Sequence, residues 1–192
     1  MPAVKDIIMK YELTTESRVA TAGATVYRIK ALRDIPEAGI RAGDLGGFVE
    51  SASNLSQAGN CWVSENARVY GNAHVYGNAL VTGNAKVSEN AKVYGDARVY
   101  GDAMVCWNAK VFGNARVSGN ARVTKTPISI DGLRYQVTIT DSHLIIGCQI
   151  HTPAEWEAFT DDDIARMDGE RAIEFWGTWK RVLLDAASRH CV

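Results

Sequence analysis

The sequence predicts a mainly β protein built around a short parallel β-helix, and three regularities lead to this prediction. Valine recurs every six residues, an alanine follows four residues after each of the first ten valines, and Asn or Asp directly precedes that alanine, usually after Gly. A short fixed period is typical of stacked structural units. The valines are Val63, Val69, Val75, Val81, Val87, Val93, Val99, Val105, Val111, Val117 and Val123.

The six-residue unit fits one short strand followed by one tight corner. It matches neither the helix period of about 3.6 residues nor the alternation of one continuous strand. Val, Tyr and Thr favour strands, while Gly-Asn and Gly-Asp tolerate the positive φ of tight turns. Three units per coil give a triangular cross-section that Val and Ala can fill. The ten complete units would then form slightly more than three coils, about 4.8 Å apart.

Residues 1–48 are expected to form a β-rich N-terminal cap. Alternation over residues 25–35 predicts a strand, and Pro36 and several glycines then interrupt the chain before residue 48. Val49 and Leu55 keep the six-residue spacing, and two extra residues then precede Val63. We therefore assign residues 49–124 to the β-helix. A stack this short exposes unpaired strand edges at both ends, so both ends require caps.

Residues 125–192 are expected to form an α+β C-terminal cap, because the period stops after Val123. The residue pattern predicts three strands, over residues 127–130, 133–140 and 143–150. Thr152 before Pro153 predicts a helix start, and Thr160 before three acids predicts another. A final helix over residues 170–188 has an apolar stripe. This stripe either covers the open end of the coil or docks a partner through Trp176 and Trp179.

The repeat unit, seen in Val69/Ala73 and Val111/Ala115, resembles that of the hexapeptide-repeat superfamily. The resemblance implies a left-handed β-helix and association as a trimer. The segment GDLGGFVESASNLSQAGNCWV is similar to uncharacterised bacterial and phage or prophage hexapeptide proteins, some of them labelled acetyltransferase-like.

Composition limits the classes of partner. The net charge of −1 gives no general signal for a polyanion. No apolar run approaches the length of a membrane span, and the N-terminus lacks a secretory pattern, so we expect a cytoplasmic protein without membrane contact. Cys61, Cys106, Cys148 and Cys191 lie more than forty residues apart and predict free thiols and no metal site.

Residues on either side of each valine point outward, and residues eighteen apart share a face. The third face, our basic/aromatic face, combines a basic column with an aromatic column. Cations can hold phosphates while rings stack on bases, so this face is a candidate site for a nucleotide-like ligand. An oligomer interface or a solvated face remains an alternative. The columns are His74, Lys92 and Lys110 beside Tyr76, Tyr94 and Phe112.

The other two faces are less regular. The first face has the outward pairs Trp62/Ser64, Leu80/Thr82, Arg98/Tyr100 and Arg116/Ser118. The second face has Arg68/Tyr70, Lys86/Ser88, Met104/Cys106 and Arg122/Thr124.

Three functions stand as hypotheses. The first is a non-enzymatic, phage- or prophage-encoded binding protein that presents trimeric basic/aromatic faces to a nucleotide-like ligand or a host protein, in a counter-defence role, without catalytic residues or cofactor. The second is a small acyltransferase that uses acetyl-CoA, with His74 as base. The coils from Val63 to Val123 lack the loop insertion common in such enzymes, which disfavours this alternative. The third is a structural or assembly module.

Overall fold

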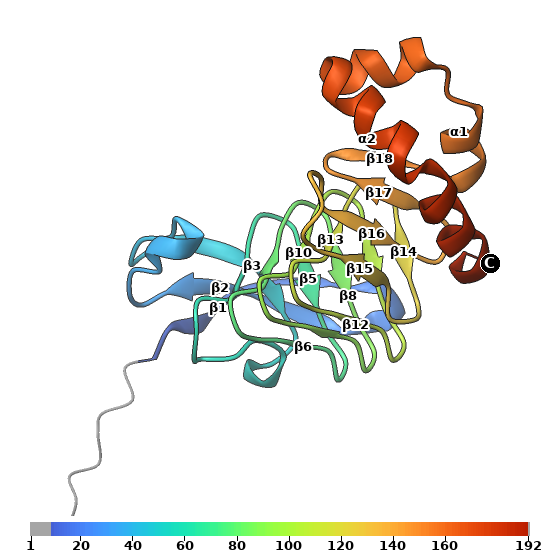
Figure 1. The fold of residues 1–192 in the computed structure, drawn as a ribbon. Coiled ribbons are helices and arrows are strands. Elements are labelled where there is room, and N and C mark those ends of the chain that lie inside the picture. Colours follow the sequence, from blue (N-terminus) through green and yellow to red (C-terminus); the bar gives the residue numbers. More distant parts are fainter. Residues whose placement is uncertain (1–8, 192) are drawn as a thin grey trace, which may run out of the picture.

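The computed structural model describes residues 9–191 and shows a mainly β protein, as the sequence predicts. A central β-helix has an antiparallel sheet at its N-terminal end and a unit of strands and helices at its C-terminal end (Figure 1). Residues 1–8 of the predicted N-terminal cap lie outside the described part. Within that part, no helix is both long and apolar enough to cross a membrane.

The repeats form short parallel strands, and three units make one coil, which confirms the predicted arithmetic. Arg68 of β5 pairs with Lys86 of β8, and Lys86 pairs with Met104 of β11, each eighteen residues on. Val49 and Leu55 begin the stack beneath Val69 and Val75, so the solenoid has about four turns. The strands are β4 (Trp62–Val63), β5 (Arg68–Val69), β6 (His74–Val75), β7 (Leu80–Val81), β8 (Lys86–Val87), β9 (Lys92–Val93), β10 (Arg98–Val99), β11 (Met104–Val105), β12 (Lys110–Val111), β13 (Arg116–Val117) and β14 (Arg122–Val123).

The coil interior consists of the repeated valines and alanines. All eleven valines from Val63 to Val123 are completely buried. Each buried Val contributes on the order of 1.5 kcal/mol or more before the entropy cost is subtracted. The corner Asn and Asp side chains form ladders between coils: the Asn72 amide donates to Asn90 at 3.1 Å, and the Asn90 amide to Asn108 at 3.3 Å. The repeat therefore specifies both the core and the corners.

The N-terminal cap extends the second face of the β-helix. It contains β1 (Tyr11–Val19), β2 (Thr25–Ala31) and β3 (Leu45–Val49), which pair antiparallel in that order. β3 then pairs in parallel with β5, so one sheet continues from the cap into the coils. Short 3-10 turns η1 (Thr21–Gly23), η2 (Pro36–Ala38) and η3 (Ala52–Asn54) connect these segments.

Side-chain donors cover the N-terminal end of the stack, where the carbonyls of the first coil lack a preceding coil. The buried Lys10 ammonium donates to the Cys61 carbonyl at 2.8 Å, and the Tyr11 hydroxyl donates to the Leu55 carbonyl at 2.7 Å. The Asn54 amide donates to two further carbonyls at 2.9 Å each. These contacts satisfy main-chain acceptors that would otherwise be buried without partners.

The C-terminal unit begins with an antiparallel sheet, and this sheet covers the last coil. It contains four strands in the order β15 (Ile128–Ile130), β16 (Val137–Ile139), β17 (Leu144–Ile146) and β18 (Gln149–His151). The prediction of one continuous strand over residues 143–150 was wrong. Gly147, with φ of 60°, allows a tight hairpin turn that divides it into β17 and β18.

Side-chain oxygens complete the C-terminal end of the stack, where amide groups of the last coil lack a following coil. Each face receives one such acceptor. The amides of Lys110, Arg116 and Thr124 donate to side-chain oxygens of Thr126, Thr138 and Asp141 at 3.3, 3.1 and 2.8 Å, respectively. The end of the β-helix is thus closed by acceptors rather than by another strand, which prevents edge-to-edge association there.

The helices pack on the far side of this sheet. Along β17, Ile145 joins the core of the coils, whereas Leu144 and Ile146 join the core of the helices. Helix α1 (Pro153–Ala158) and helix α2 (Asp161–His190) start at the predicted caps Thr152 and Thr160. α2 is broken at Asp168 and Gly169, next to the predicted start of the last helix. The sheet, rather than the final helix, therefore covers the open coil.

Candidate ligand-binding face

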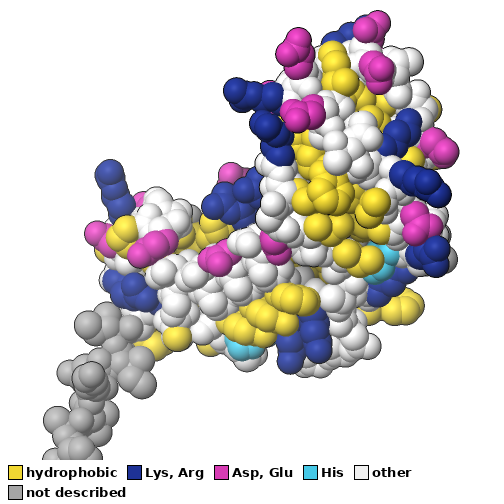
Figure 2. All heavy atoms as spheres, viewed as in Figure 1, with side chains coloured by type: hydrophobic (Ala, Val, Ile, Leu, Met, Phe, Trp, Pro, Cys, Tyr) yellow, Lys and Arg dark blue, Asp and Glu magenta, His cyan; other side chains and the backbone are white. Residues whose placement is uncertain are grey.

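The structure brings all six predicted ligand-binding residues onto one sheet. In β6, β9 and β12, His74 pairs with Lys92, and Lys92 pairs with Lys110. Tyr76, Tyr94 and Phe112 follow these strands and lie one above another. Figure 2 shows a hydrophobic band beside Lys or Arg side chains and a histidine in the region where Figure 1 labels β6 and β12. The basic/aromatic face is thus continuous.

The aromatic column forms a stacked ladder. The rings of Tyr76 and Tyr94 are 4.7 Å apart and 4° from parallel, and those of Tyr94 and Phe112 are 5.3 Å apart and 12° from parallel. These spacings follow from the strand separation of about 4.8 Å. A base cannot enter between rings that already touch. The column therefore offers a ligand its ring edges and its end, where Phe112 is 45% exposed.

The two lysines of this face carry free charges. Both Lys92 and Lys110 are exposed, and neither is paired with a carboxylate of residues 9–191. Like charges at this spacing repel by roughly 0.8 kcal/mol in water, so the column does not stabilise the fold. A bound anion would remove this repulsion.

His74 stands at the N-terminal end of the face and is half-buried. Its ring centre lies 5.1 Å from that of Tyr76, at 45°. Burial, and secondly the charge of Lys92, lower the pKa of His74, so its imidazole is neutral at neutral pH. A neutral imidazole can accept a proton, but no carboxylate of residues 9–191 contributes to this pKa shift, so none of them is in place to orient the ring. The alternative catalytic role of His74 stays a prediction.

The two tryptophans predicted as docking residues belong to the core of the C-terminal unit. Trp176 is only 5% exposed, and its ring lies 5.0 Å from that of Trp156. Trp179 is half-buried and packs against the same cluster. In this fold Trp176 offers no surface to a partner, because the apolar stripe of the helix is used to cover the far side of the sheet.

Trp107 is a candidate functional residue that the repeat analysis missed. It occupies a corner position with φ of 61°, a conformation that favours glycine, and its side chain is 57% exposed. Strained exposed residues often mark functional positions. Trp107 precedes Lys110 and Phe112 on the same coil. The sequence signal was the replacement of Gly by Trp in the unit Cys-Trp-Asn-Ala, where neighbouring coils have Gly or Glu.

These features define a β-solenoid protein with a basic and aromatic face. Residues 73–89, 91–106 and 109–125 match a family model described as YdcK Beta solenoid repeat. Each matched segment is close to one coil in length. The match agrees with the expected hexapeptide-type β-helix. A search of curated proteins found no match for this chain.

Proposed function

We propose that this protein is a non-enzymatic binding protein whose basic/aromatic face binds a nucleotide-like ligand. The observation that carries the proposal is the register of Lys92 and Lys110 beside the aromatic ladder, with both ammonium groups unpaired among the described residues. Phosphates would bind the lysine column, and one base would stack on the end of the ladder at Phe112. Trp107, at the corner that precedes β12, would add an aromatic surface on the Lys110 side of the face.

The setting of this function rests on the resemblance to hexapeptide proteins. We include in the proposal a trimer, in which clefts between subunits enclose the three basic/aromatic faces, and a cytoplasmic location. The proposal also includes phage or prophage origin, a counter-defence role and a host protein as the bound partner. Sedimentation of the full chain measures the oligomeric state directly.

Titration of the full chain with mono-, di- and cyclic nucleotides tests the binding site. We expect saturable binding that weakens at least tenfold in Lys110→Gln and in Phe112→Leu, because these changes remove a phosphate contact and the stacking surface. Salt should weaken binding in the wild type.

Lys86→Gln is the matched control, since Lys86 holds the equivalent position on β8 of the second face. Its affinity should equal that of the wild type. Absence of saturable binding to every nucleotide, or equal losses in Lys86→Gln and Lys110→Gln, would contradict the proposal.

A further inference from the structure

A groove lies over the first face, away from the basic/aromatic face. It consists of two adjoining hollows of about 240 Å³ and 170 Å³ that share Leu80 and Arg98. Figure 2 shows Lys and Arg side chains gathered in the bend between the N-terminal cap and the C-terminal helices. The larger hollow is also lined by Thr82, Val99, Tyr100 and Arg116, and the smaller one by Glu37, Asn60, Asn78 and Asp96.

One end of the groove is basic. Arg98 of β10 and Arg116 of β13 are register partners on adjacent parallel strands, so their backbones are about 4.8 Å apart. Both side chains are exposed, and neither forms an ion pair within residues 9–191. Two adjacent guanidinium groups provide the forked donors that phosphate oxygens prefer. Thr82 and Tyr100 add hydroxyl groups beside them.

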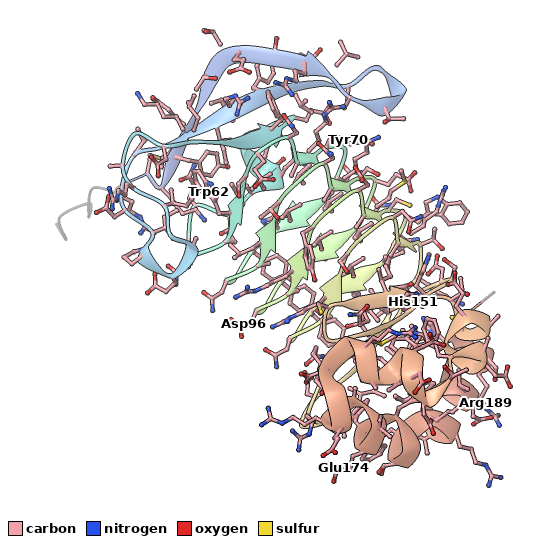
Figure 3. All side chains as sticks on the ribbon, turned by 90° about the horizontal axis from the view of Figure 1, so that it is seen from above. Trp62, Tyr70, Asp96, His151, Glu174 and Arg189 are labelled. Carbon is pink, nitrogen blue, oxygen red and sulfur yellow. The ribbon has the colours of Figure 1, made fainter. Side chains whose placement is uncertain are left out.

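The other end of the groove is acidic. Glu37 belongs to η2 of the N-terminal cap, and Asp96 lies at a coil corner, where Figure 3 shows it at the edge of the solenoid. The Asn78 amide donates to one oxygen of Asp96 at 3.0 Å. Glu37 forms no ion pair with another described residue. Arg98 also lines this hollow, but the two carboxylates outnumber it, so this end suits an ammonium group or another donor-rich group.

We propose that the groove binds a small organic phosphate that also carries an amine. The phosphate lies on Arg98 and Arg116, the amine lies between Glu37 and Asp96, and the carbon skeleton crosses Leu80. Together the two hollows fall at the lower end of the range for small-molecule sites, roughly 300 to 1,000 Å³. The floor includes β7 and β10, each paired on both sides, and ends at β13, the last strand of this sheet. This site is independent of the proposed nucleotide site.

Calorimetric titration of the full chain with O-phosphoethanolamine at low ionic strength tests the groove. We expect saturable binding that weakens at least tenfold in Arg98→Gln and in Arg116→Gln. Glu37→Gln should weaken binding of O-phosphoethanolamine but leave binding of glycerol 3-phosphate, which has no amine, unchanged.

Arg122→Gln is the matched control, because Arg122 is an exposed arginine on β14 of the second face. It should bind as the wild type does, and all four variants should keep the wild-type melting temperature. No saturable heat with O-phosphoethanolamine would overturn the proposal, as would equal weakening by Arg122→Gln and Arg98→Gln. Lys110→Gln should leave this binding intact, which separates it from failure of the nucleotide site.

Discussion

The corner glycines show how a single Cβ atom limits the sequence of this solenoid. Gly95 and Gly113 occupy the same corner in consecutive coils, with φ of +71° and +64°. A Cβ at Gly95 would lie 2.9 Å from the amide nitrogen of Gly113, whereas a Cβ at Gly113 would meet nothing within 4 Å. The two positions share the backbone strain and differ in the space above them.

Alanine at these two corners should therefore have different effects. Gly113→Ala is expected to cost about 1 kcal/mol, because only the positive φ is unfavourable. Gly95→Ala should cost on the order of 2 kcal/mol more, because the next coil must also move. Urea unfolding of both variants measures this difference. Equal losses of unfolding free energy would show that contact with the next coil does not restrict the residue type at this corner.

At the scale of the element, strands of two residues are stable only because each lies between two others. The first and last strands lack one neighbour, and side chains take its place. At the C-terminal end, Thr138 of β16 is 1% exposed and accepts the Arg116 amide, while Thr126 accepts the Lys110 amide at an exposed position. Water can replace the second contact but not the first.

Thr138→Val should destabilise the protein by about 1 to 3 kcal/mol, because it keeps the shape of the side chain and leaves the Arg116 amide without an acceptor. Thr126→Val, the exposed counterpart, should change the free energy of unfolding by about 0.5 kcal/mol or less. Chemical unfolding provides both values. If Thr126→Val lowered the free energy of unfolding as much as Thr138→Val does, burial of the hydrogen bond would not explain the difference between the two positions.

At the scale of the whole molecule, the N-terminal cap places two buried titratable residues, Lys10 and Tyr11, against the first coil. Burial raises the pKa of Tyr11 to about 12, with a smaller contribution from Cys61. Burial also lowers the pKa of Lys10. The unfolded Tyr11 loses its proton near pH 10 while the folded one keeps it, so this residue stabilises the fold fully below pH 10 and loses that effect as the pH rises to about 12.

Stability should consequently fall between pH 10 and 12 by on the order of 2 to 3 kcal/mol through Tyr11 alone. Lys10 acts in the opposite direction, because the unfolded lysine binds its proton more tightly than the folded one. Its contribution to the free energy of unfolding therefore increases as the pH rises toward 10.5. Urea unfolding across pH 8 to 11.5 tests this, with Tyr11→Phe as comparison. The same decline above pH 10 in both proteins would rule out Tyr11 as its source.

Several features were predictable because they depend on short, regular spacing. Thr152 and Thr160 cap helices as expected, since capping involves residues three positions apart. The burial of Trp176 was not predictable, because the helical stripe does not say which surface it meets. The hairpin in residues 143–150 was missed because an apolar run concealed the turn at Gly147.

The sequence by itself determined the stack and the grouping of its outward side chains into three faces. A six-residue period with three units per coil sets which residues are neighbours, so Lys92 and Lys110, or Arg98 and Arg116, can be paired by counting. Only the tertiary structure decided how the ends are closed and where the surface is hollowed. Those properties depend on contacts across tens of residues, such as Lys10 with Cys61 and Thr138 with Arg116, and no local spacing encodes them.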